Sequence, residues 1–172
     1  MTVEDTLHEG EFLRLKRVGT WEYAERVNAR CAVVIVAVTD AGELLLVEQP
    51  RQPVGANVLE LPAGLVGDID GAEDEEMAVA AARELEEETG YRAGRLEFLA
   101  GGPPSAGLAN EAAYFYRAFD LQRIDAGGGD DSEQITPHAV PLDGIEAWLA
   151  ARAGEGVLVD PKIYAGLYFV NR

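Results

Sequence analysis

Three things are scarce in this chain of 172 residues: cysteine, positive charge and long apolar runs. Cys31 is the only cysteine, which excludes an intrachain disulfide and a cysteine metal cluster. The longest apolar run, around 31–38, has about eight residues, whereas a helix that spans a bilayer needs roughly 20. The N-terminal segment MTVEDTLHEG is acidic and lacks the apolar stretch of a signal peptide. We therefore expect a soluble cytoplasmic protein.

The charge balance is strongly acidic. Only 14 Lys and Arg stand against 31 Asp and Glu, which gives a formal net charge of -17. Nucleic-acid-binding surfaces are basic, and anionic membranes repel a negative chain, so we expect neither partner. A small anion can still bind where metal ions and a few arginines reverse the sign locally. No Ser-His-Asp arrangement and no Walker loop is visible, and His8 and His138 stand alone.

The apolar pattern predicts one domain in which strands are mixed with a few helices. Residues 11–17 and 20–27 alternate polar with apolar, as in a hairpin, and 31–38 is typical of a buried central strand. Because strands and helices do not alternate regularly, we expect an α/β (α+β) fold with a mixed β-sheet between helices. Further strands are expected at 43–49, 58–61, 95–100, 112–121 and 135–141, and further helices at 142–153 and 162–170.

The clearest helix is expected from about 73 to 89, after a glycine-containing loop at 64–72. Asp70 or Asp74 is expected to cap its start. Gly90 stands where a left-handed C-terminal cap is expected. The segment RELEEETG therefore forms the last turns of this helix and the cap that ends it.

Three glutamates of this helix, Glu84, Glu87 and Glu88, stand at i, i+3 and i+4 and so point the same way. Like charges at this spacing repel by roughly 0.2–0.5 kcal/mol per pair. Either the face lies in water, as most acidic helix faces do, or it binds a cation. Converging carboxylate oxygens suit Mg²⁺ or Mn²⁺.

From Glu75 to Tyr91 the chain resembles the Nudix box, G-x5-E-x7-R-E-U-x-E-E-x-G-U, where U is a bulky apolar residue. Glu75 is followed by seven residues and then by RELEEETGY, which matches the pattern. Ten residues separate Gly64 from Glu75 where the pattern has five, so the loop before the helix is longer. The resemblance implies the Nudix fold.

Other segments resemble the branch of ADP-ribose and nucleotide-sugar pyrophosphatases, although Ala106 replaces a proline that marks ADP-ribose preference. The implied reaction is Mg²⁺-dependent hydrolysis of the pyrophosphate bond of a nucleoside diphosphate sugar, with ADP-ribose giving AMP and ribose 5-phosphate as the leading case. GDP-mannose or another nucleotide sugar is an alternative substrate, and a catalytically weak sensor of nucleotide sugars is an alternative function. The matching segments are Glu48–Arg51 (Q-x-R), Leu59–Gly64 (E-L-P-A-G), Ser105–Glu111 (S-P-G-x-S-x-E), Thr20–Glu22 with Arg26, and Asp160–Lys162 (D-x-K).

The resemblance also implies roles for single residues. Glu84, Glu87 and Glu88 would bind Mg²⁺, or Mn²⁺ in its place, with the Ala63 carbonyl oxygen as a further ligand. Arg83 would pair with Glu87 and orient its carboxylate. The general base stays open between Glu133, Glu111 and a glutamate of the helix. The implied substrate-binding residues are Arg51, Arg26, Trp21 and Glu22.

The resemblance divides the chain into an N-terminal hairpin at 1–29 and a Nudix domain at 30–172. In dimeric members of the branch this hairpin reaches a partner, so we expect a homodimer. Trp21 has two open readings, a nucleobase stack or a place in the core or the dimer interface.

Overall fold

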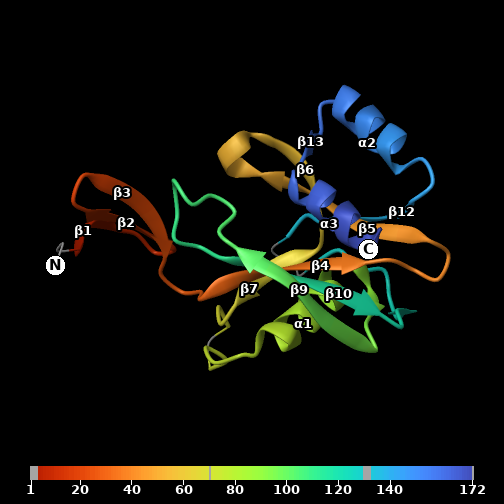
Figure 1. Cartoon of the computed structure of the whole chain (residues 1–172), viewed down its shortest axis with the longest axis horizontal. Helices are drawn as coiled ribbons and strands as arrows, with labels where there is room; N and C mark the ends of the chain where they lie inside the picture. Colours follow the sequence, from red (N-terminus) through yellow and green to blue (C-terminus); the bar gives the residue numbers. More distant parts are fainter. Residues whose placement is uncertain (1–3, 70, 130–132, 172) are drawn as a thin grey trace.

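The computed structural model describes residues 4–69, 71–129 and 133–171. A small N-terminal sheet projects from a body built of sheets and helices (Figure 1). The predicted hairpin corresponds to its strands β2 (Leu13–Val18) and β3 (Trp21–Arg26). A third strand, β1 (Glu4–Glu9), pairs antiparallel with β2, so the hairpin is part of a three-stranded sheet.

The body contains two four-stranded sheets, in the orders β7-β4-β10-β9 and β12-β5-β6-β13. Both are mixed, because β4 runs parallel to β10 and β6 runs parallel to β13, while their other pairs are antiparallel. The short strands β8 and β11 pair with each other. The bounds are β4 (Cys31–Ala37), β5 (Glu43–Arg51), β6 (Ala56–Glu60), β7 (Ala63–Val66), β8 (Tyr91–Arg92), β9 (Arg95–Gly102), β10 (Ala113–Phe119), β11 (Gln122–Arg123), β12 (Thr136–Pro141) and β13 (Leu158–Val159), with a 3-10 turn η1 at Gln52–Val54.

Strand β4 is the centre of the fold because it is buried on both faces. Val33 and Ile35 pack on the side of helix α1 (Met77–Thr89). Val34 and Val36 pack on the opposite side, which helices α2 (Ile145–Gly154) and α3 (Lys162–Val170) cover. The predicted mixed α+β fold with sheets between helices is confirmed, and the apolar run at 31–38 is its central strand.

Two local predictions were wrong. Residues 63–66 form strand β7 rather than loop, because they complete the edge of the first sheet by pairing with β4. Helix α1 begins only at Met77, with Glu76 as N-cap and no side-chain capping bond, so Asp74 does not cap it. Asp70 lies outside the described residues. Gly90 does end the helix in the left-handed region, at φ 74°, and its N–H donates to the Glu86 carbonyl at 2.9 Å.

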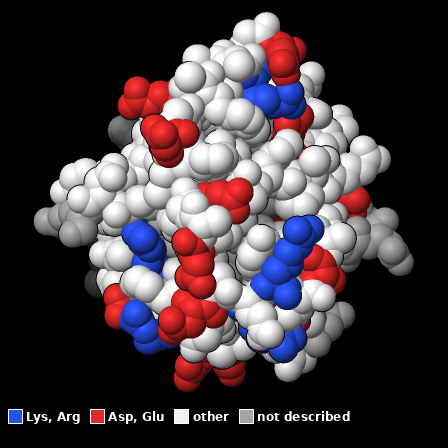
Figure 2. Space-filling view, turned by 90° about the vertical axis from the view of Figure 1, so that its right-hand side faces the viewer, with Lys and Arg blue, Asp and Glu red and all other residues white. Residues whose placement is uncertain are grey.

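Within the described ranges, no helix is both long and apolar enough to cross a membrane. On the face drawn in Figure 2, acidic side chains run down the middle and the Lys and Arg side chains form small separate groups beside them. Positive charge on this face is therefore confined to small separate groups, in line with the acidic composition of the chain.

Candidate active site

A pocket of about 410 Å³ opens where β4, β7 and α1 meet. Charged side chains dominate its lining. The cationic ones are Arg26, Arg51 and Lys162. The carboxylates are Glu60, Asp68, Glu84, Glu88, Glu111 and Glu133. Carboxylates outnumber cations two to one, so the pocket repels an anion unless a bound cation changes the balance.

Two glutamates of α1 reach this pocket and pack against the backbone of β7. Glu88 is only 3% exposed, and its Oε2 accepts a hydrogen bond from the Ala63 N–H at 3.0 Å. The Glu84 carboxyl group lies so close to Gly64 that a Cβ there would stand 1.9 Å from the Glu84 Cδ. Only glycine at position 64 leaves room for this carboxyl group.

Burial disfavours the ionised form of these two carboxyl groups. It raises the pKa of Glu84 to about 7, although Arg83 opposes the shift. It raises the pKa of Glu88 to about 8, and the charges of Glu84 and Glu133 add to this shift while the Ala63 N–H opposes it. A divalent cation beside the pair would favour the ionised forms, and carboxylate oxygens are the ligands that Mg²⁺ prefers.

The donor set fits such an ion but is incomplete by itself. Among the described residues, no three His, Cys, Asp or Glu side chains form a ready metal cluster. Mg²⁺ usually binds through one or two carboxylates and completes its shell with water and substrate phosphates. Glu84, Glu88 and the nearby backbone of Ala63 match that arrangement.

Glu87 does not share this orientation. At about 100° per residue, Glu88 lies about 40° from Glu84 on one side of the helix, and Glu87 lies about 60° away on the other, towards Arg83. Its side chain is 49% exposed, does not line the pocket, and accepts a hydrogen bond from Arg83 Nη1 at 3.1 Å. In this structure Glu84 and Glu88 line the pocket, while the third predicted metal ligand, Glu87, is turned to Arg83.

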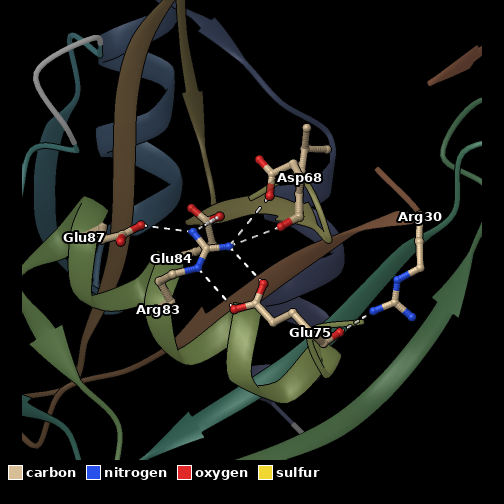
Figure 3. Close-up of polar contacts among 7 residues, drawn as sticks. Arg30, Asp68, Glu75, Arg83, Glu84 and Glu87 are labelled. Carbon is tan, nitrogen blue, oxygen red and sulfur yellow. Dashed lines mark hydrogen bonds and ion pairs between the residues drawn. The ribbon is translucent and has the colours of Figure 1, made fainter. Parts of the chain in front are cut away.

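Arg83 connects the helix with the long loop before it (Figure 3). Its Nη1 donates to Glu84 Oε1 at 2.8 Å, and its Nε and Nη2 donate to the two carboxylate oxygens of Glu75 at 3.3 and 3.2 Å. Burial opposes the charged form, but Glu75, Glu84 and Glu87 outweigh it and keep the pKa of Arg83 above its ordinary range. The guanidinium thus fixes the direction of Glu84 as well as that of Glu87.

The predicted phosphate-binding arginines both line the pocket, each paired with a carboxylate of the pocket. Arg51 donates to Glu60 at 2.7 Å, and Arg26 forms an ion pair with Glu111. Trp21 and Glu22, at the start of β3, are not brought to this pocket. Trp21 is 60% exposed on the N-terminal sheet, so it is not a core residue of this chain.

A glycine-rich turn ties the segment before Glu133 to the end of α1. The Gly128 N–H donates to the Glu88 carbonyl at 2.9 Å, and the Gly129 N–H donates to the Glu87 carbonyl at 3.0 Å. These bonds satisfy carbonyls that the helix end leaves open. They bring the chain back to the pocket, where Glu133 lies near the buried Glu88.

Sequence analysis missed several residues of the pocket, among them Glu60, Asp68 and Lys162. Glu60 and Lys162 stand in segments that resemble the pyrophosphatase branch, which was the available signal. Asp68 lies in the longer loop, and its place beside Arg83 Nη2, at 4.0 Å, had no signal in the sequence.

Gly64→Ala is expected to lower both divalent-cation affinity and hydrolysis by at least about tenfold, because the new Cβ displaces the Glu84 carboxyl group. The clash is with the end of a flexible side chain, so the fold should persist. Circular dichroism and a Mn²⁺ titration check both points. Gly154→Ala is the matched control, since nothing lies within 4 Å of its Cβ. Unchanged cation affinity in Gly64→Ala would contradict this view of the site.

A NUDIX domain model matches residues 29–157. The chain is 35% identical over 104 residues to the methanol dehydrogenase activator of Bacillus methanolicus, covering 60% of this chain and about half (54%) of that protein. It is 34% identical over 177 residues to the ADP-ribose pyrophosphatase of Mycobacterium tuberculosis (strain ATCC 25618 / H37Rv), covering 97% of this chain and 80% of that one.

The fold agrees with these sequence similarities. The crystal structure of an ADP compounds hydrolase superposes with a TM-score of 0.72 at 22% identity, covering 98% of this chain and 90% of that one. The domain match begins just after the N-terminal sheet and takes in α1 with its glutamates. The chain therefore belongs to the Nudix family.

Proposed function

We propose that the protein hydrolyses the pyrophosphate bond of a nucleoside diphosphate sugar with the help of Mg²⁺, and that ADP-ribose is its substrate, giving AMP and ribose 5-phosphate. The observation that carries the proposal is one pocket that joins the buried carboxylate of Glu88 and the partly buried carboxylate of Glu84 with cationic side chains. A diphosphate bound to divalent metal ions would contact the carboxylates through the metal. Its phosphate oxygens would contact the arginine and lysine side chains of the pocket.

Glu84 and Glu88 would hold the cation, with the Ala63 carbonyl as a backbone ligand. A divalent cation in this place neutralises the diphosphate, polarises its P–O bonds and lowers the pKa of water. Arg83 would keep Glu84 in position through its 2.8 Å hydrogen bond. Mn²⁺ could take the same place, since it accepts the same oxygen ligands.

Arg51, Arg26 and Lys162 would bind the phosphate and ribose oxygens. A guanidinium offers a planar pair of donors that suits two phosphate oxygens at once, whereas the Lys162 ammonium acts as a point charge. Each is paired with a carboxylate, Glu60, Glu111 and Asp160 respectively. These pairs hold the cations in place before the substrate arrives.

We propose Glu133 as the general base that takes the proton of the attacking water. It lines the pocket near Glu88 and follows the turn that is bonded to the end of α1. The competing candidate, Glu111, also lines the pocket and pairs with Arg26. Glu87 would act through Arg83 rather than on the substrate, because it lies outside the pocket.

We also propose that the N-terminal segment 1–29, which contains the sheet of β1, β2 and β3, forms a homodimer with a second copy. The sheet leaves large apolar side chains in water, among them Phe12 at 59%, Leu13 at 50% and Trp21 at 60% exposure. Exposed apolar groups that gather on one small element are typical of an interface. Trp21 and Glu22 would then serve the partner's pocket rather than their own.

The decisive experiment measures AMP release from ADP-ribose in the presence of Mg²⁺, beside GDP-mannose and other nucleotide sugars as competing substrates. ADP-ribose is expected to give the highest kcat/KM. GDP-mannose or another nucleotide sugar is the alternative, since Ala106 stands where the proline that marks ADP-ribose preference is expected. Binding of ADP-ribose without turnover would instead indicate a sensor and contradict the proposal.

A further inference from the structure

The loop that follows β9 is attached to the N-terminal sheet of the same chain. Strand β3 and this loop form a parallel bridge at Ala24 and Ala109. The Ala24 N–H donates to the Leu108 carbonyl at 2.8 Å, and the Asn110 N–H donates to the Ala24 carbonyl at 3.2 Å. Figure 1 shows this loop, between β9 and β10, reaching out beside β3. The loop thus pairs with the edge of β3 at a single position.

A side-chain contact reinforces the bridge. The Asn110 Nδ2 donates to Glu25 Oε1 at 2.9 Å, one residue beyond the bridged position on each segment. Hydrogen bonds to a charged acceptor are stronger than neutral ones. Glu25 is itself held in the sheet by Lys16, whose Nζ lies 3.3 Å from Glu25 Oε2. The contact therefore ties the loop to an anchored side chain.

Both ends of the attached loop line the pocket. Pro104 lines the pocket near the start of the loop, and Glu111 lines it at the end, where it pairs with Arg26. Between them the loop is a compact turn, in which the Ser105 carbonyl accepts hydrogen bonds from the Leu108 and Ala109 N–H groups at 2.9 and 3.0 Å. A compact turn moves as a unit, so its attachment to β3 sets where both ends lie.

We infer that Glu25 and Asn110 are a positioning pair: through them the N-terminal sheet holds the loop 103–111 at the pocket of its own chain and sets the affinity for substrate. Neither side chain contacts the α1 carboxylates, so the pair acts on binding rather than on the cation or the chemical step. The inference rests on the proposed function only for its kinetic readout.

The kinetic test compares Glu25→Ala and Asn110→Ala with the wild type on the nucleotide sugar that the wild type hydrolyses best. Either change should raise KM roughly three- to tenfold, as expected for loss of one solvent-exposed hydrogen bond, while kcat stays within about twofold. Glu25→Gln keeps the acceptor oxygen and should restore most of the affinity. The double variant should be no worse than either single one, because both remove the same contact.

A matched control separates this contact from general loosening of the sheet. Glu4→Ala also removes an ion pair with Lys16, at 2.7 Å, but leaves the loop untouched, so its KM should match the wild type. Mn²⁺ affinity should be unchanged in all these variants. Unchanged KM in both Glu25→Ala and Asn110→Ala, or an equal rise in Glu4→Ala, would overturn the inference.

Amide hydrogen exchange provides a test that does not depend on activity. The Asn110 amide, bonded to Ala24, should be protected in the wild type and should exchange at least about threefold faster in Glu25→Ala, with α1 unchanged. Equal exchange in the two proteins would overturn the inference. If the wild type hydrolyses none of the nucleotide sugars, the proposed function is wrong, and the exchange comparison alone decides the positioning role.

Discussion

Glu88→Gln is expected to reduce kcat for pyrophosphate hydrolysis by about 10²–10³-fold, which corresponds to about 3–4 kcal/mol of transition-state stabilisation. The substitution keeps the size of the side chain and an oxygen that can accept from the Ala63 N–H, so the packing at β7 should be preserved. It removes the negative charge that we propose holds the cation. Steady-state kinetics at saturating Mg²⁺ measure the loss.

The control for this variant is Glu86→Gln on the same helix. Glu86 pairs with Arg92 at 2.8 Å outside the pocket, so its loss should change kcat by less than about twofold. A Glu88→Gln enzyme that keeps more than a fifth of the wild-type kcat would contradict the proposed role.

Thermal unfolding distinguishes loss of function at Glu88 from loss of fold. The folded pKa of Glu88 is raised to about 8 from an ordinary 4.5, so its stabilising contribution is present below about pH 4.5 and is lost as the pH rises through 8. Glutamine cannot ionise. Without divalent cations, Glu88→Gln should therefore unfold at a higher temperature than the wild type at pH 8.5, and at a similar one near pH 5.

Glu133→Gln is expected to lower kcat by about 10²–10⁴-fold, the range for removal of a general base. Its affinity for divalent cations should stay near that of the wild type, because Glu84 and Glu88 are intact. Single-turnover kinetics and a Mn²⁺ titration would show both effects.

Glu111→Gln is the comparison that decides between the two candidate bases. Since Glu111 pairs with Arg26, its loss should raise KM more than it lowers kcat. A loss of kcat that is larger in Glu111→Gln than in Glu133→Gln would transfer the role of base to Glu111.

The sequence predicted the parts of the fold that depend on local chemistry. The β-branched run at 31–38 became the central strand β4, and Gly90 became the cap of α1, because burial and a left-handed turn each require those residue types. Strand β7 was missed because its glycine suggested a loop. It is a strand because it pairs with β4, which lies about 30 residues earlier in the sequence. The late start of α1 was missed because Glu76 makes no capping bond.

The same division holds for the candidate site. The i, i+4 spacing was enough to place Glu84 and Glu88 together, since both lie on one helix. Glu87 stays a predicted metal ligand; its hydrogen bond with Arg83 is the pairing that the i, i+4 spacing predicted. Lys162 enters the pocket because α3 packs back on β4, a tertiary contact for which the signal in the sequence was the D-x-K resemblance.

The central claim is that Glu84 and Glu88 together gather a divalent cation in this acidic pocket. Mn²⁺ titration, followed by the electron paramagnetic resonance signal of the free ion, tests it at pH 6.5 and 8.5. We predict binding by the wild type that is tighter at pH 8.5, because two carboxyl groups with pKa values of about 7 and 8 must lose their protons first, and no binding at this site by the Glu84→Gln/Glu88→Gln variant. Equal Mn²⁺ uptake by the folded double variant and the wild type would contradict the account.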